Sequence, residues 1–192
     1  MDRVRDDVTI ADLWREAVSR WGDRPFLAVP PNAERAYWPG GYEISYHDAD
    51  AAICRLAKAY RLAGYGVGIR VAMLMENRPE HILHRLALNR LGACVVPINP
   101  DYRPAETAYL LEHAEPALIV TIGARRTQID AALKESRHRP PVHLPEKSEA
   151  PPRAATPAST FTPRPETEAE ILYTSGTTGR PKGCILSHGY EV

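Results

Sequence analysis

The residues best suited to chemistry lie in one run near the end of the sequence, Tyr173 to Gly183. Phosphate oxygens carry negative charge and accept many hydrogen bonds, and glycines let backbone N–H groups approach them closely. Hydroxyl side chains add further donors, and a lysine adds positive charge. The run therefore predicts a loop that binds phosphates through Thr174, Ser175, Gly176, Thr177, Thr178, Gly179 and Lys182.

This loop differs from the P-loop of common nucleoside triphosphatases. That motif requires a glycine, four other residues, and then Gly-Lys-Ser/Thr. The fifth residue after Gly176 is Pro181, and Lys182 is followed by Gly183. The apolar residues after Gly183 predict a strand, so we do not expect a helix N-terminus to hold the anion. The alternative is a surface hairpin with a solvated lysine, but a run of this length favours phosphate binding.

Helices and strands alternate ahead of the loop. Apolar residues recur at helical spacing after Thr9, and either Thr9 or Asp7 can cap that helix. Gly22 and Gly64 are natural helix ends. Short apolar runs of strand length separate the later helices. The pattern predicts helices over 9–21, 47–63, 79–91, 104–113 and 124–137, and strands over 26–29, 44–46, 71–75, 93–98, 117–122, 142–144 and 170–173.

From residue 44 to residue 137, each predicted strand is followed by a helix. Continuous apolar strands between amphipathic helices are typical of an α/β fold with a mainly parallel sheet covered on both faces. Residues 138–166 interrupt this order, because they contain eight of the 18 prolines in the chain. Proline is incompatible with helix interiors and central strands, so we expect a linker or surface excursion there.

The composition of the chain excludes several classes of protein. The 192 residues include 24 basic and 24 acidic side chains, which does not favour a nucleic-acid partner. No apolar stretch is long enough to span a bilayer, and the first residues lack the core of a signal peptide, so we expect a cytoplasmic protein. The three cysteines and seven histidines show no metal-binding spacing, and we expect the cysteines to pack in the core.

The run from Tyr173 to Gly183 resembles the signature of the adenylate-forming enzymes, which include acyl-CoA synthetases, the adenylation domains of peptide synthetases, and luciferases. Upstream segments resemble the same family, notably Asn77-Arg78-Pro79-Glu80 after its strand and the segment from Gly92 to Pro100. The resemblance covers residues 9–192 as the N-terminal portion of an AMP-binding domain, with residues 1–8 as an extension. Within the family, Asn99-Pro100 is more similar to acyl-CoA ligases.

The resemblance implies a two-step reaction. A carboxylic acid would react with ATP to give an acyl-adenylate and pyrophosphate, and coenzyme A would then accept the acyl group as a thioester. The loop would hold the β- and γ-phosphates of ATP, with Mg²⁺ sharing their charge. The fatty-acid metabolism in which many such ligases act is the implied setting.

The resemblance also implies that much of the active site lies outside this sequence. The family's adenine-binding segment, magnesium-binding glutamate, ribose-binding aspartate and catalytic lysine would all follow Val192. We therefore expect an incomplete fold with no catalytic residue and no metal ligand within the chain, inactive alone. Two alternatives remain open: a non-catalytic truncated product with at most weak ATP binding, and an adenylation domain of the peptide-synthetase type.

Overall fold

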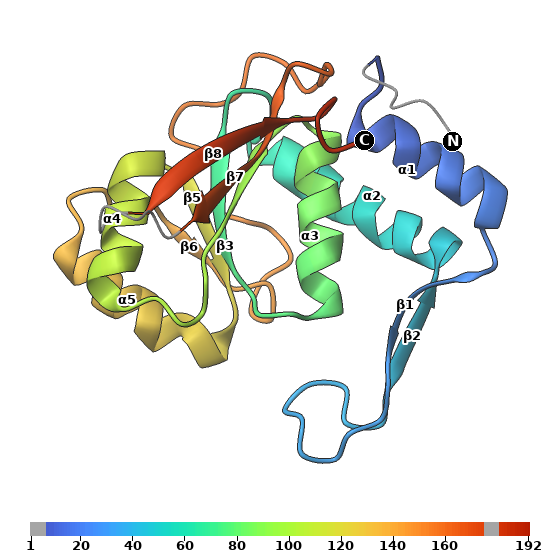
Figure 1. Ribbon diagram of the computed structural model, residues 1–192, viewed down its shortest axis with the longest axis horizontal. Coiled ribbons are helices and arrows are strands. Elements are labelled where there is room, and N and C mark those ends of the chain that lie inside the picture. The colour runs from blue at the N-terminus through green and yellow to red at the C-terminus, as the bar shows by residue number, and fades with distance from the viewer. Residues whose placement is uncertain (1–6, 175–180) are drawn as a thin grey trace.

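A six-stranded sheet forms the centre of the structure, a computed structural model that describes residues 7–174 and 181–192 (Figure 1). The strand order is β6-β5-β3-β4-β7-β8, and every neighbouring pair is parallel except β7 and β8, which are antiparallel. The strands span β3 (Arg70–Leu74), β4 (Cys94–Pro97), β5 (Leu118–Thr121), β6 (Val142–His143), β7 (Glu168–Thr174) and β8 (Lys182–Ser187). The predicted α/β fold with a mainly parallel sheet is confirmed.

Helices cover both faces of this sheet, as the continuous apolar strands predicted (Figure 1). Val71 and Met73 of β3 contribute to one buried cluster, while Ala72 and Leu74 contribute to the other, because successive side chains of a strand point to opposite faces. The helices are α1 (Ile10–Trp21), α2 (Tyr46–Leu62) and α3 (Pro79–Arg90) on the first face, and α4 (Pro104–Ala114) and α5 (Arg126–Glu135) on the second. In the part of the chain that the structure describes, none of these helices is long and apolar enough to cross a membrane.

The order of the strands creates a switch point between β3 and β4. The chain leaves β3 through α3 on one face, and it leaves β4 through α4 on the other face to reach β5. In open parallel sheets, ligands bind where neighbouring strands send their connections to opposite faces, beyond the carboxyl ends of those strands. Strand β5, the other neighbour of β3, also leaves through a helix on the second face, so this topology favours a ligand in the crevices on both sides of β3.

The strand predicted at 44–46 is present and precedes a helix as expected, but the expectation that it joins the main sheet is wrong. Strand β2 (Tyr42–Ser45) pairs antiparallel with β1 (Pro25–Val29) as a separate two-stranded ribbon, which projects beside α2 (Figure 1). Both strands are only partly buried. A short apolar run gives no information about its pairing partner, and a nearby strand is the easiest partner to reach.

The proline-rich segment is packed against the body of the protein. Ala154 and Ala158 donate backbone hydrogen bonds to the carbonyl oxygens of Ala63 and Gly64, both at 2.8 Å. Phe161 packs against the cluster under α2 and α3. A Cβ on Gly66 would lie 2.5 Å from the ring of Phe161, so the turn after α2 requires a glycine for this close approach.

Two expectations about side chains have different outcomes. The Oγ1 of Thr9 accepts a hydrogen bond from the backbone N–H of Asp12, so Thr9 caps α1 as predicted. The expectation that all three cysteines pack in the core is wrong, because only Cys94 is buried, while Cys54 is half-buried and Cys184 is exposed. Cys184 lies on β8 at the edge of the sheet, where no further strand among the described residues covers it.

The different burial of two leucines predicts that their substitution by alanine changes the stability of the protein to different extents. Leu111 of α4 is 0% exposed, whereas Leu62 at the end of α2 is 70% exposed. We expect Leu111→Ala to lower the free energy of unfolding by about 2–5 kcal/mol, because it removes buried methyl groups and leaves a cavity. Leu62→Ala should change it by less than about 0.5 kcal/mol. Urea unfolding of both variants measures the difference, and equal losses would contradict this description of the core.

Candidate functional site

The two described ends of the predicted phosphate loop lie side by side. Thr174 is the last residue of β7, Lys182 is the first residue of β8, and the two are cross-strand partners in the antiparallel pair. The strand predicted after the loop is therefore confirmed as β8. Ser175, Gly176, Thr177, Thr178 and Gly179 lie outside the described residues. Because β7 is parallel to β4, the hairpin end lies at the carboxyl edge of the sheet.

Strand β7 is attached to its neighbours by side chains near its start. Arg70 of β3 donates from Nε and Nη2 to the two carboxylate oxygens of Glu168, both at 3.0 Å. The amide nitrogen of Asn89 on α3 donates to the carbonyl oxygen of Ala169 at 2.9 Å, in a buried position. A bidentate arginine–carboxylate pair restricts geometry in addition to attracting charge. These bonds fix the position of β7 along its neighbouring strands and its orientation in the sheet.

A second arginine joins β7 to the residues that follow β8. Arg85 of α3 donates hydrogen bonds to both Glu170 and Glu191. Burial raises the pKa of Glu170 to about 7, although Arg85 beside it acts in the opposite direction. His188 is fully buried close by, burial lowers its pKa to about 4, and neither ring nitrogen has a hydrogen-bond partner among the described residues. This cluster holds both strands of the hairpin against α3.

The far end of the hairpin is held against α4. The hydroxyl of Tyr173 and Nδ1 of His113 are 2.6 Å apart, and the His113 ring also stacks on Tyr109. Burial raises the pKa of Tyr173 to about 12, so its hydroxyl is protonated at neutral pH. A Cβ on Gly183 would lie 3.0 Å from Ile171 and 3.2 Å from the ring of Tyr173. The glycine that ends the predicted loop therefore leaves room for the tyrosine that begins it.

A hollow of about 300 Å³ lies at the switch point between β3 and β4. Its walls come from the loops that follow these strands and from the first turn of α3. Hydrogen bonds connect the two loops to the short helix η1 (Gly123–Arg125) and to α5 at the same edge of the sheet. Arg125 donates to Glu76 at 2.6 Å, and Gln128 donates to the carbonyl oxygen of Pro100 at 2.9 Å. The lining residues are Met75, Glu76, Asn77, His81, Ile82, Ile98 and Pro100.

The sequence pattern did not identify this hollow as a candidate site. Glu76 adopts φ of 61°, a left-handed conformation that is uncommon for a residue other than glycine and often found at functional positions. The sequence does show that Glu76 and Asn77 follow a buried strand, which is the available signal. It does not show which strand lies beside β3, and the hollow depends on that neighbour.

A different hollow, of about 440 Å³, lies beside Pro181 and α4. It is lined by Glu106, Glu112 and Glu135 together with Ala105, Ala108, Tyr109 and Pro181. Three carboxylates around one opening make it unfavourable for the phosphates of a nucleotide. This hollow is therefore a poor candidate for a phosphate site.

The two histidines spaced three residues apart on α3 have separate surroundings. Nδ1 of His81 lies 3.2 Å from the carbonyl oxygen of Glu76, whereas Nδ1 of His84 lies 2.7 Å from the hydroxyl of Tyr60. No group of three or more histidine, cysteine or acidic side chains in the described ranges could hold a metal ion. These two histidines therefore have different partners, and they line two different cavities.

Comparison with known proteins identifies the family of this chain. Residues 14–192 match the family model described as AMP-binding enzyme. The chain is 30% identical over 184 residues to a sulfoacetate–CoA ligase of Cupriavidus necator, covering 93% of this chain and 35% of that protein. It is 32% identical over 193 residues to a crotonobetaine/carnitine–CoA ligase of Salmonella typhi, covering 93% and 36%. It is 29% identical over 182 residues to tyrocidine synthase 3 of Brevibacillus parabrevis, covering 95% and 2%.

Solved structures agree with this family in their fold. A fatty acyl-CoA synthetase of Mycobacterium tuberculosis matches with a TM-score of 0.72 at 22% identity, covering 94% of this chain and 34% of that chain. The N-terminal subdomain of NpsA from Klebsiella oxytoca matches with a TM-score of 0.73 at 22% identity, covering 96% and 43%. This chain belongs to the AMP-binding enzyme family. It spans about a third of the length of the curated CoA ligases it matches.

The buried Glu170 predicts a pH dependence of stability with a definite sign. Its pKa in the folded protein, about 7, lies above its ordinary value of 4.5. The neutral carboxyl therefore stabilises the fold at acid pH, and this contribution is lost as the pH rises through about 7. We expect the free energy of unfolding of the wild type, relative to Glu170→Gln, to fall between about pH 5 and about pH 8.

Urea unfolding at several pH values measures this difference. Glu43→Gln on the exposed side of β2 is the control for removing one carboxylate from the surface. A rise in the relative stability of the wild type over the same pH range would contradict the prediction. It would mean that the ion pair with Arg85 outweighs the burial of Glu170.

Proposed function

We propose that this chain is part of a ligase that activates a carboxylic acid with ATP and transfers the acyl group to coenzyme A. The observation that carries the proposal is the hairpin, which brings Thr174 and Lys182 together at the carboxyl edge of a parallel sheet. Membership in the AMP-binding family supports the nucleotide, and the two CoA ligases among the relatives support the thiol.

The proposed role of the loop is to position and neutralise the phosphates of ATP. The hydroxyls of Thr174, Ser175, Thr177 and Thr178 would orient phosphate oxygens, and Gly176 and Gly179 would open backbone N–H groups to them. Lys182 would supply a positive charge at the edge of the loop. Stabilising charge on the transferred group is the main contribution that a protein makes to such a step.

The proposal also covers the metal ion, the domain bounds and the cellular setting. Mg²⁺ would share the charge of the phosphates and would be held mainly by residues outside this chain, which itself contributes no catalytic residue. Residues 9–192 would be a portion of one AMP-binding domain, with 138–166 as a surface excursion and 1–8 as an extension. We further propose a cytoplasmic location and fatty-acid metabolism as the setting. The chain in isolation would not turn over substrate.

A second candidate function is an adenylation domain that passes its acyl group to a carrier-protein thiol. The similarity to tyrocidine synthase 3 favours it. Both functions share adenylate formation, so the acceptor distinguishes them. With the acid that the enzyme activates, the release of AMP should depend on free coenzyme A under the first proposal and on a carrier protein under the second.

The role of Lys182 can be tested by exchange of labelled pyrophosphate into ATP, using the whole protein as it is encoded and a panel of carboxylic acids. Lys182→Ala removes one charge-assisted contact, which is worth about 1.5–3 kcal/mol. We expect the exchange rate to fall about tenfold to a hundredfold. Lys58→Ala, on the exposed side of α2, is the matched control and should leave the rate unchanged.

If Lys182→Ala exchanged pyrophosphate at the wild-type rate, this result would contradict the proposed role of Lys182 in phosphate binding. If wild-type protein gave no exchange with any acid while remaining folded, the proposal of an active ligase would fail as well. Circular dichroism of each variant distinguishes loss of contact from loss of fold.

A further inference from the structure

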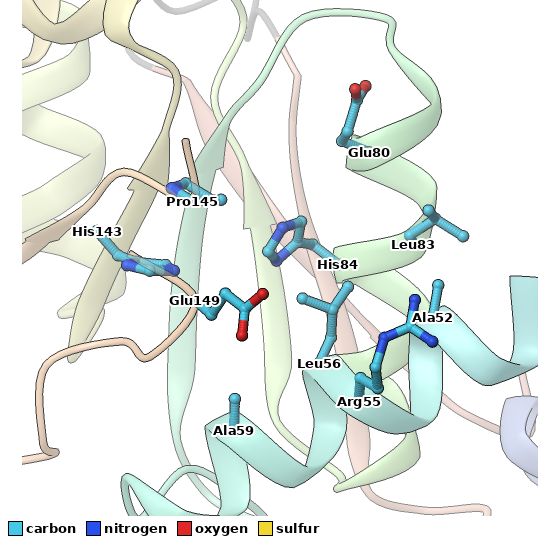
Figure 2. Close-up of a pocket in the computed structure, with 10 residues that line it drawn as sticks. All are labelled: Ala52, Arg55, Leu56, Ala59, Glu80, Leu83, His84, His143, Pro145 and Glu149. Atoms are coloured by element: carbon cyan, nitrogen blue, oxygen red, sulfur yellow. The ribbon is translucent and has the colours of Figure 1, made fainter. Parts of the chain in front are cut away.

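A cavity of about 300 Å³ lies between α2, α3 and the segment around β6 (Figure 2). Strand β6 is at the opposite edge of the sheet from β8, so this cavity is separate from the phosphate hairpin. Ala52, Leu56, Ala59, Leu83 and Pro145 give it an apolar wall. Arg55, Glu80, His84, His143 and Glu149 are the remaining lining residues.

The His84 ring directs one nitrogen into this cavity, and its neighbour Tyr60 fixes which nitrogen carries the proton. The Tyr60 hydroxyl is buried, and Nδ1 of His84, at 2.7 Å, is its hydrogen-bond partner among the described residues. The hydroxyl proton needs an acceptor, so Nδ1 accepts it and the proton of the neutral ring is on Nε2. Burial lowers the pKa of His84 to about 3, which keeps the ring neutral. His84 therefore presents a fixed N–H donor to the cavity.

His143 contributes a second buried polar group. It is 4% exposed, it lines the cavity, and no hydrogen bond of its imidazole is found among the described residues. Figure 2 shows its ring directed toward the space in front of His84. Burial lowers the pKa of His143 as well. Its ring nitrogens are open to the cavity, so a ligand with a complementary group can take the place of water there.

The charged residues at the cavity balance one another. Arg55 and Glu149 are both exposed, they have opposite charges, and neither forms an ion pair among the described residues. Glu80 is already engaged, because its carboxylate accepts from the indole N–H of Trp38 at 3.0 Å and lies 3.4 Å from Nε of Arg78. Figure 2 shows the Glu149 carboxylate directed into the cavity, and Arg55 lines it with the opposite charge, so the cavity has no net charge to attract an ion.

We propose that this cavity is a second binding site, which takes a small uncharged molecule with an apolar or aromatic body and one hydroxyl group. The hydroxyl of the ligand would accept a hydrogen bond from Nε2–H of His84 and donate one to a ring nitrogen of His143. The apolar body of the ligand would lie against Leu56, Ala59 and Leu83. A charged ligand would bind less well, because the two buried histidines are neutral and the charges of Arg55 and Glu149 offset one another. The size of the cavity is within the range of small-molecule sites.

Phenol, toluene and benzoate share a benzene ring and differ in its substituent, which is a hydroxyl, a methyl or a carboxylate group. Together they test the proposal. Each is titrated into the protein while NMR follows the imidazole resonances of His84 and His143. We expect phenol to shift both sets of resonances and to bind about tenfold more tightly than toluene, because one hydrogen bond to an otherwise unpaired group is worth about that factor. Benzoate should bind more weakly than phenol.

Variants of two alanines on α2 link binding to the cavity. Ala59→Phe places a ring in the cavity and should abolish the shifts, whereas Ala51→Phe adds the same ring at an exposed position outside the lining and should leave them unchanged. Tighter binding of benzoate than of phenol would overturn the proposal in favour of an anion site at Arg55. Unshifted imidazole resonances with all three probes, or full phenol binding by a folded Ala59→Phe variant, would also overturn it.

Discussion

The parallel attachment of β7 to β4 is the constraint on which the rest of the site depends. Parallel strands send their carboxyl ends to one edge, so this attachment brings the end of β7 to the same edge as the loops after β3 and β4. The register between β4 and β7 includes a single aligned pair, Val95 with Glu170. Because this ladder is short, side chains from β3 and α3 are needed to hold β7 as well.

Those side chains contact the hairpin at successive points along β7. Arg70 and Asn89 fix the start of β7, Arg85 joins its middle to the segment after β8, and His113 holds its end through Tyr173. A bidentate ion pair and a buried amide hydrogen bond tolerate little displacement. The two described ends of the loop, Thr174 and Lys182, therefore start from a backbone whose position is determined by the sheet and by helices on both of its faces.

Much of this fold could be predicted from the sequence because its central strands are buried on both faces. Continuous apolar runs such as 71–75 and 117–122 are typical of such strands. The helices between them begin at Pro79 and Pro104, as expected for proline in the first turn of a helix. The pairing of β2 could not be predicted, because its apolar residues fit either a ribbon or a sheet. Likewise, nothing in the sequence links Arg85 with Glu170, which are 85 residues apart and meet only after the strands are ordered.

The candidate site was predictable to a similar and limited extent. The composition of the loop indicates phosphate chemistry, since glycines, hydroxyls and one lysine together supply the donors and the charge that phosphates require. The switch-point hollow and the cavity at His84 depend on which elements become neighbours, and composition carries no such information. Tyr60 and His84 illustrate this point, because neither residue is unusual alone and together they fix the direction of a hydrogen bond.

The proposed function requires that a hairpin held in this way carries a loop that binds nucleotide phosphates. Titration of the isotope-labelled protein with Mg-ATP, followed through its backbone amide resonances, shows whether it does. We expect the largest shifts at residues 173–183, with smaller ones at the carboxyl ends of β3 and β4. Shifts centred elsewhere, or no shifts at ATP concentrations that saturate nucleotide-binding proteins, would contradict it.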